Sequence, residues 1–112
     1  MSSQKIELRS GRLYNLIEGD AVVPPEQVVE LYGMIVGDVD VQPKGKLVLR
    51  GMVAGNLTVE KGGVAEVSGM VAKSIQSGGG WIDISGMVIG SVQGDMSSVK
   101  IRSNASIGGN PR

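Results

Sequence analysis

The chain has 112 residues, one domain's worth, with 11 lysines and arginines against 11 aspartates and glutamates, and neither cysteine nor histidine. The lack of cysteine excludes disulfides and thiolate metal sites, and the lack of histidine removes the commonest general base and metal ligand. A net charge of zero offers no basic field to nucleic acid or an anionic membrane. The polar N-terminus lacks a signal-peptide pattern and no stretch has the length of a membrane span, so we expect a cytoplasmic protein.

The composition also predicts a narrow core. The chain contains 18 glycines and no phenylalanine, and aromatic residues make up only 3% of it. Phenylalanine normally fills wide cores, so its absence beside abundant valine, isoleucine and leucine indicates a thin aliphatic core. A β-solenoid has such a core because its chain coils around a column of aliphatic side chains.

The first twelve residues are expected to form an N-terminal cap. Residues 6–9 read Ile-Glu-Leu-Arg, which predicts a short strand before the first repeat. Terminal layers of a solenoid need capping to protect the open end of the core. We expect the repeats to occupy residues 13–107 and the C-terminal end residues 108–112 of a single domain that spans residues 1–112.

A short repeat of nearly constant length runs through most of the chain. The dipeptide Gly-Met recurs at Gly33, Gly51, Gly69 and Gly86, with the last step shorter than the first two by a single residue. An earlier copy in residues 13–20 aligns with residues 31–38, and a faded last copy occupies residues 101–106. A fixed period of this length is typical of stacked repeats, so we predict about six layers of roughly 17–18 residues.

Apolar residues alternate within each layer, which is the periodicity of a β-strand. Stacking the layers aligns these residues in five columns that contain no charged residue. The pattern therefore predicts an all-β fold, a single-stranded parallel β-helix. The columns are Val29, Leu47, Ala65, Ile82 and Val99; Leu13, Leu31, Leu49, Val67, Ile84 and Ile101; Ile17, Ile35, Val53, Val71, Val88 and Ala105; Ala21, Val39, Leu57, Ile75 and Val92; and Val23, Val41, Val59 and Ser77.

Each layer is expected to have three short faces. Inward apolar positions recur at one third of the repeat length, so we predict a triangular section. The corner before each methionine carries glycine, for which we expect a left-handed backbone conformation. A third turn includes Pro24-Pro25 and Gly78-Gly-Gly80, and the loss of one residue from the repeat is expected near it. The period leaves the handedness of the coil open.

The layer core resembles that of bactofilins, bacterial cytoskeletal proteins. The stretches that carry the resemblance are Gly33-Met-Ile-Val-Gly-Asp-Val39, Gly51-Met-Val-Ala-Gly-Asn-Leu57 and Gly86-Met-Val-Ile-Gly-Ser-Val92, and the similarity spans residues 13 to about 107. The resemblance implies a right-handed triangular β-helix that polymerises end to end without nucleotide. Two features depart from the family: the chain lacks its usual disordered tails, and methionine stands where an outward polar residue is usual.

The methionine column is the sharpest functional feature. By strict alternation Val53 points inward, so Met52 and Ala54 point outward. A contiguous exposed apolar patch usually marks an interaction site, and methionine adapts to the shape of a partner. Alternatively, a bulged corner could turn each methionine into the core. The predicted protein interface is Met34, Val36, Met52, Ala54, Met70, Ala72, Met87 and Ile89.

Other motifs favour structural interpretations. The polar column at Asp20, Asp38, Asn56, Ser74 and Ser91 lacks the spacing of calcium solenoids, so we expect a solvated ladder that stabilises a turn. Trp81 is expected to cover a corner, and Asp40, Glu60 and Asp83 are interpreted as single outer-face carboxylates. Hexapeptide-repeat acyltransferases use a histidine base, which this chain lacks. We predict no enzyme activity, no metal and no cofactor.

Two functions remain in competition. The resemblance implies a self-assembling structural scaffold, joined through its end layers or its apolar lateral strip. The alternative is a small inhibitor, such as a bacterial toxin immunity protein, that docks the apolar strip onto a partner protein. Pro24 and Pro25 in the first layer and Ser103, Asn104 and Ser106 in the last are interpreted as caps, which favours the inhibitor. No nucleic-acid partner and no membrane span are expected.

Overall fold

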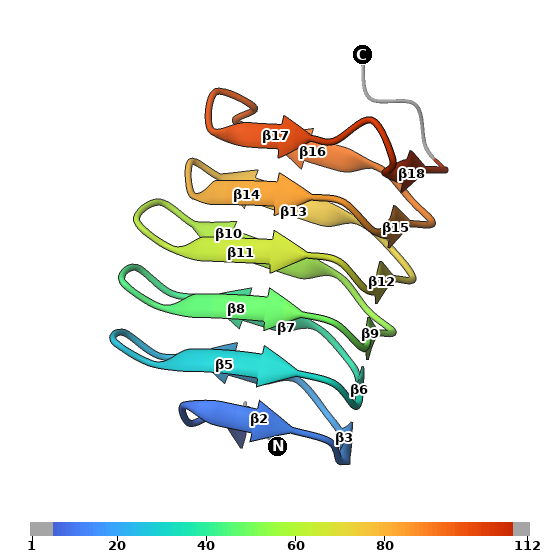
Figure 1. The fold of residues 1–112 in the computed structure, drawn as a ribbon. Coiled ribbons are helices and arrows are strands. Elements are labelled where there is room, and N and C mark those ends of the chain that lie inside the picture. Colours follow the sequence, from blue (N-terminus) through green and yellow to red (C-terminus); the bar gives the residue numbers. More distant parts are fainter. Residues whose placement is uncertain (1–5, 109–112) are drawn as a thin grey trace, which may run out of the picture.

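A computed structural model describes residues 6–108, which form eighteen β-strands and contain no helix (Figure 1). Short strands separated by glycine-rich turns follow from the period-2 alternation within each repeat. The strands are β1 (Ile6–Glu7), β2 (Gly11–Leu13), β3 (Leu16–Glu18), β4 (Ala21–Val23), β5 (Val28–Leu31), β6 (Met34–Val36), β7 (Val39–Val41), β8 (Lys46–Leu49), β9 (Met52–Val53), β10 (Leu57–Glu60), β11 (Val64–Val67), β12 (Met70–Val71), β13 (Ile75–Gly78), β14 (Trp81–Ile84), β15 (Met87–Val88), β16 (Val92–Gly94), β17 (Val99–Ile101) and β18 (Ser106–Ile107).

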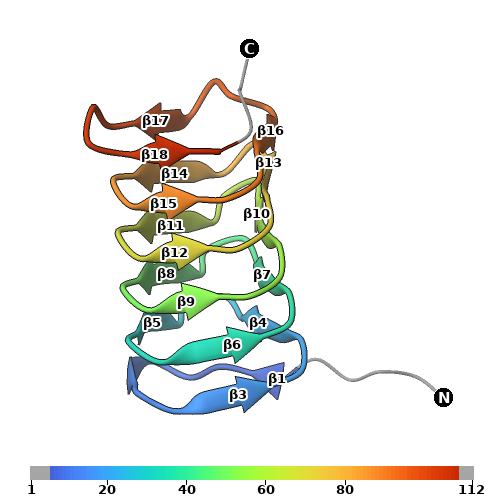
Figure 2. The same ribbon diagram turned by 90° about the vertical axis from the view of Figure 1, so that its right-hand side faces the viewer.

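Every third strand pairs in parallel, which produces three six-stranded sheets. We call them sheet A (β1, β4, β7, β10, β13, β16), sheet B (β2, β5, β8, β11, β14, β17) and sheet C (β3, β6, β9, β12, β15, β18). Three consecutive strands make one layer, and the six layers form a triangular prism (Figure 2). In Figure 1 the chain crosses the front from left to right and returns behind the molecule one layer higher, which is a right-handed coil. The predicted triangular β-solenoid is confirmed.

The core is a set of stacked aliphatic columns, as the alternation predicts. Strand register places Leu31 beside Leu49 in sheet B and Ile35 beside Val53 in sheet C, and all four side chains are fully buried. The core cluster consists only of alanine, valine, leucine and isoleucine. Ser77 is the one buried polar residue among those described, and it ends the column that begins at Val23. Aromatic rings therefore lie outside the core, in agreement with its predicted narrowness.

The last layer departs from the predicted register. Val88 pairs with Ile107 in β18, whereas the repeat spacing predicts Ala105 in that column. Ile84 pairs with Ile101 in the register that the spacing predicts, so the discrepancy arises between β17 and β18. Two extra residues therefore enlarge the corner between these strands. Ala105 is half-buried against the core, and its amide donates to the Arg102 carbonyl within this turn.

The corner glycines are required by close packing and not by a left-handed conformation, which corrects the sequence-based expectation. A Cβ atom on Gly51 would overlap the carbonyl oxygen of Gly33 in the layer below, and Gly69 and Gly86 stand in the same relation to the preceding corner. None of these residues has positive φ. Layers touch backbone to backbone at this corner, so any side chain would force them apart.

Left-handed residues occur in the other two turns. Gly19 and Gly37 have φ of 123° and 153° in the corner that follows sheet C. In the third turn the left-handed position is filled by Glu26, Lys44, Gly62 and Gly79, one per layer, with φ between 69° and 109°. The repeat loses one residue in this third turn, as predicted, because Glu60 pairs with Gly78 but Val64 pairs with Trp81.

The N-terminal strand is part of the first layer. β1 pairs with β4 in sheet A, with Ile6 beside Ala21, and Leu8 is buried. The short strand predicted at residues 6–9 is therefore present as β1. Residues 1–5 and 109–112 of the predicted cap and C-terminal end lie outside the described residues.

Gly51→Ala should lower the free energy of unfolding by about 2–3 kcal/mol or more, because the new methyl group overlaps backbone that cannot rotate away. Gly78→Ala is the matched control. Its added Cβ would meet nothing closer than 3.4 Å and its φ is not positive. We expect the control to be neutral or stabilising by up to about 1 kcal/mol in urea denaturation. Equal effects of the two substitutions would contradict the close-packing explanation.

Candidate functional site

The predicted apolar interface lies on the outer surface of sheet C. Strand register stacks the methionines directly above one another, with Met52 between Met34 and Met70, and Met70 beside Met87. The residue that follows each of these methionines in the sequence is fully buried in the core: Ile35, Val53, Val71 and Val88. Each methionine therefore points away from the core, because neighbouring residues of a strand face opposite sides.

The eight predicted residues form one continuous strip, which we call the Met strip: Met34, Val36, Met52, Ala54, Met70, Ala72, Met87 and Ile89. Its exposed fraction is largest toward its two ends, at 43% for Val36, 42% for Met87 and 48% for Ile89. Its middle residues are half-buried by their neighbours. Leu16, which is 59% exposed, extends the methionine column into the first layer. No methionine belongs to the core of residues 6–108, so the alternative inward packing is wrong.

A ladder of side-chain oxygens supports the corner beside the Met strip. The Asp20 carboxylate accepts a hydrogen bond from the Asp38 amide at 2.9 Å, and the Asp38 carboxylate accepts one from the Asn56 amide at 2.7 Å. Asn56 and Ser74 continue the pattern toward Ser91. Each side chain satisfies a backbone amide one layer on, which confirms the predicted turn-stabilising ladder. No group of three or more acidic, histidine or cysteine side chains among the described residues could hold a metal ion.

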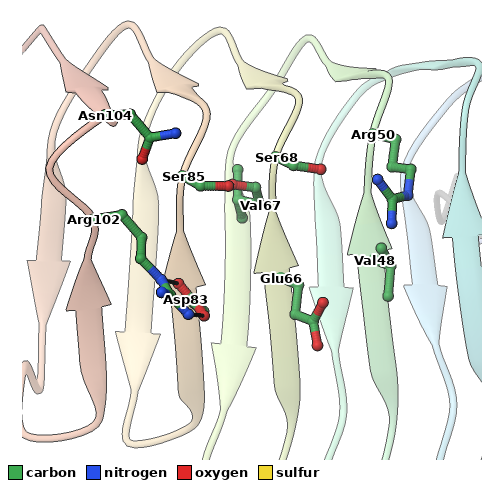
Figure 3. Close-up of a pocket in the computed structure, with 9 residues that line it drawn as sticks. All are labelled: Val48, Arg50, Glu66, Val67, Ser68, Asp83, Ser85, Arg102 and Asn104. Atoms are coloured by element: carbon green, nitrogen blue, oxygen red, sulfur yellow. Dashed lines mark hydrogen bonds and ion pairs between the residues drawn. The ribbon is translucent and has the colours of Figure 1, made fainter.

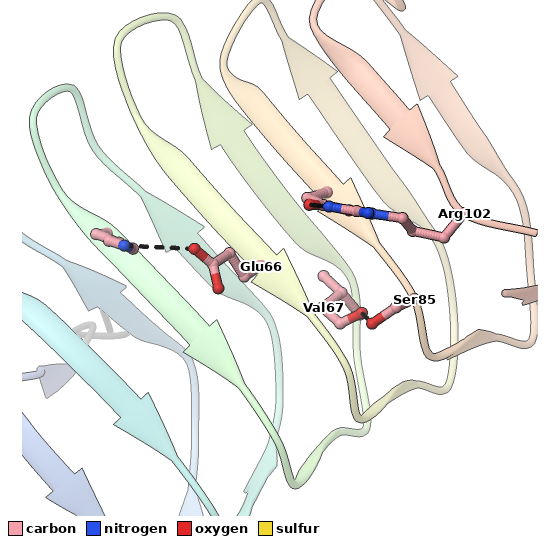
Figure 4. Close-up of polar contacts among 6 residues, drawn as sticks. Glu66, Val67, Ser85 and Arg102 are labelled. Carbon is pink, nitrogen blue, oxygen red and sulfur yellow. Dashed lines mark hydrogen bonds and ion pairs between the residues drawn. The ribbon is translucent and has the colours of Figure 1, made fainter. Parts of the chain in front are cut away.

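Sheet B carries ion pairs that link neighbouring layers. Arg12 donates to Glu30 at 3.1 Å. Lys46 lies 3.4 Å from Glu66, whose ion pair is drawn in Figure 4. Arg102 binds Asp83 with two hydrogen bonds, of 2.8 and 2.7 Å. The interpretation of Asp83 as a single carboxylate is therefore wrong. The repeat aligns Asp83 with Lys100. Its bidentate partner is instead Arg102, two residues further along, where the enlarged last corner begins.

The Asp83–Arg102 pair shifts the pKa of both of its members. The hydrogen bond from Arg102 lowers the pKa of the Asp83 carboxyl below its usual value, and the positive charges of Arg102 and Lys100 act in the same direction. The same contact raises the pKa of Arg102. The Asp83 side chain is only 14% exposed, whereas that of Arg102 is 49% exposed. The guanidinium group thus covers the carboxylate and shields it from solvent.

A shallow hollow of about 330 Å³ lies beside this pair on sheet B (Figure 3). Arg50 and Arg102 stand at its opposite ends, and the small side chains of Ser68 and Ser85 lie between them. The Ser68 hydroxyl donates to the backbone carbonyl of Leu49. The Ser85 hydroxyl donates to that of Val67 (Figure 4). Each hydroxyl proton is therefore directed at a main-chain carbonyl and not at a side chain that could act as a general base. The prediction of no enzyme activity stays a prediction.

Aromatic residues on sheet B form a group that the sequence analysis does not single out. Tyr14 and Tyr32 stack with ring centroids 5.0 Å apart, and the Arg50 guanidinium lies 6.0 Å from the Tyr32 centroid. Their spacing of one repeat is the feature that could have revealed the stack. Trp81 follows the third turn on the outside of sheet B and is 44% exposed. The tyrosine stack, the separate Trp81 ring and the hollow give sheet B an amphipathic surface that differs from sheet C.

No protein-family model, curated protein or solved structure matches the chain. The described residues contain no helix with the length and hydropathy needed to cross a bilayer. Function is therefore inferred from the shape, charge and exposed side chains of the molecule.

Met52→Glu combined with Met70→Glu should leave the protein folded. No core side chain is lost, and two glutamates on adjacent strands should cost about 1 kcal/mol of unfolding free energy. Val53→Asp, one residue away, should cost at least about 4 kcal/mol because it buries a charge in the aliphatic core. Circular dichroism with urea denaturation measures both. Unfolding of the double glutamate variant would contradict the outward placement of the methionines.

The Asp83–Arg102 pair should make stability depend on pH. Because the pKa of Asp83 is lowered in the folded protein, the pair stabilises the fold fully above the ordinary aspartate pKa. This contribution is lost as the pH falls through the lowered folded-state pKa, since the unfolded chain takes up the proton first. Asp83→Asn should therefore be less stable than the native protein at pH 6, and the difference should shrink as the pH is reduced toward 3. A difference that is constant with pH would contradict this pairing.

Proposed function

We propose that the protein is a non-catalytic structural scaffold that assembles end to end, as its resemblance to bactofilins implies. The proposal rests on the strand edges and the exposed apolar side chains at the two ends of the described coil. Each end presents three parallel strand edges, and most apolar side chains of its layer are only partly covered by residues 6–108, with Leu8 at one end and Val92 at the other as buried exceptions. Unpaired strand edges can pair with strands of another molecule, and contact with that molecule would remove the exposed apolar side chains from water.

The N-terminal end exposes the beginnings of the core columns. Leu13 and Ile17 are half-buried, whereas the residues stacked on them one layer on, Leu31 and Ile35, are fully buried. Ile6, at the edge of sheet A, is 40% exposed. Contact with another apolar layer would complete the burial of these side chains.

The C-terminal end is open in the same way. Ile101 is 38% exposed, and Val99 and Ile107 are half-buried. Stacking the first layer of a second copy on this end in continuous register would bring Leu13 onto Ile101 and Ile17 onto Ile107. All of these contacts are aliphatic. A contact between two different ends of one molecule is heterologous, so it generates filaments when it does not close into a ring.

The residues interpreted as N-terminal caps lie elsewhere in the structure. Pro24 and Pro25 belong to the turn between β4 and β5 in the second layer, and the edge strands of the first layer are β1, β2 and β3. They therefore do not blunt the N-terminal edge. Ser103 and Asn104 do lie at the C-terminal end, in the corner between β17 and β18, but β17 itself ends in the apolar Ile101.

A capped inhibitor, comparable to a toxin immunity protein, is the second candidate. The Met strip supports it, because a rigid apolar lateral surface could fill a cleft on a partner protein. This candidate requires a chain that remains monomeric at all concentrations. The open ends favour the scaffold, and the two candidates make opposite predictions about self-association.

Sedimentation velocity over a concentration series, with electron microscopy of the same samples, tests the scaffold. We expect large species that grow with concentration and filaments that are one coil wide or a small multiple of it. Ile101→Glu should abolish them, because it places a charge in the joint between copies. Lys100→Gln is the matched control on the same edge strand and should assemble like the native chain. A native chain that stays monomeric would refute the scaffold and favour the inhibitor.

A further inference from the structure

We propose that the Met strip is the contact by which two filaments of this protein pair side by side, in parallel, after end-to-end growth has begun. This inference rests on the proposed scaffold function. It assigns the strip to a second copy of this chain and sets the order of assembly. The area of the strip, its direction, its side-chain sizes and the chemistry of the other two sheets support this pairing.

The strip is too small to hold two single molecules together. Its four layers, Met34 to Met87, span about 15–20 Å at a strand spacing of about 4.8 Å, and its two columns are about 10 Å wide. A single copy therefore offers roughly 200 Å², well below the approximately 800 Å² per partner of a standard stable interface. An isolated pair of copies should dissociate readily.

End-to-end growth removes this limitation. The strip runs along the coil axis, from Met34 in the second layer to Met87 in the fifth, which is also the direction of stacking (Figure 2). In a filament each added copy repeats the strip in line with the last. Two layers interrupt it: the layer that contains Ser106 and Gly108, and the first layer of the next copy, where Leu16 continues the methionine column but Glu18 occupies the second column. About four copies in register reach the area of a stable interface, and the contacts then act together because they are linked.

The side-chain sizes within the strip fit a second copy in parallel orientation. A two-fold axis along the coil brings the methionine column of one copy opposite the second column of the other. Met52 then faces Ala54 of the second copy and Met70 faces its Ala72, so a large side chain meets a small one in both middle layers. Alternation of large and small residues across a contact allows the two surfaces to interdigitate. An antiparallel pair would instead set methionine against methionine.

The other two sheets limit the assembly to two filaments. Sheet B carries the ion pairs of Arg12, Lys46 and Arg102, and the outer surface of sheet A carries Thr58, Gln76 and Gln93. These polar surfaces gain little from contact with a copy of themselves, because their groups are solvated or already paired. Sheet B also exposes Val28, Tyr32 and Trp81, but charged residues such as Lys46 interrupt them, so the continuous apolar strip is that of sheet C. One neighbouring filament covers this strip. Doublets are expected, without larger sheets.

Electron microscopy of the full-length chain tests the pairing. The native protein should form doublets above the concentration at which filaments appear. Met52→Glu with Met70→Glu should give single filaments of similar length, since the end layers are unchanged. Ala54→Gln with Ala72→Gln should have the same effect without adding charge, by filling the small positions. Thr58→Glu with Gln76→Glu, on adjacent strands of sheet A, is the matched control and should retain doublets.

The outcomes separate the two proposals. Single filaments of the native chain, or doublets that survive both strip variants, would overturn the pairing and leave the scaffold intact. Loss of doublets in the sheet A control would also overturn it, because added charge alone would then explain the result. Absence of filaments from the native chain would refute the scaffold and with it the pairing. Circular dichroism of every variant confirms that it is folded.

Discussion

The fold depends on how closely successive layers approach at the corner before each methionine. There the backbone of one layer lies against the carbonyl of the layer below, and a Cβ atom on Gly33, Gly51, Gly69 or Gly86 would overlap that carbonyl. Only glycine permits this contact, so it recurs in four successive layers and fixes the vertical alignment of the strands on either side. The five core columns and the straight Met strip both follow from this alignment.

At the corner on the other side of sheet C, side-chain oxygens link successive layers through hydrogen bonds to backbone amides. Asp20, Asp38 and Asn56 each accept the backbone amide of the residue one layer on. A backbone amide in a turn has no strand partner, and an unsatisfied one would be costly where the turn is partly buried. The narrow strands of sheet C, two or three residues each, are thus held between a close-packed corner and a hydrogen-bonded one. Together these corners make the surface that carries the Met strip rigid.

Features that repeat in every layer could be predicted from the sequence, and features that occur once could not. Val53 inward and Met52 outward follow from strict alternation, and the structure confirms both. The assignment of Ala105 to the core column is wrong because nothing in a faded repeat reveals two inserted residues. The corner glycines are recognisable, but glycine serves positive φ and close packing equally well, and only coordinates distinguish the two. The partner of Asp83 depends on the same insertion.

The sheets of the prism differ in whether their outward side chains find partners within the same molecule. Sheet B pairs charges of neighbouring layers with one another, as in Arg12 with Glu30 and Arg102 with Asp83. The apolar side chains of the Met strip cannot be buried within one molecule in this way, because stacking one methionine on another shields only part of each side chain from water. Met87 and Ile89 remain 42% and 48% exposed in spite of perfect register. The continuous apolar strip of sheet C and the two ends are therefore the surfaces that contact with other rods, or with a partner shaped to fit the strip, would bury.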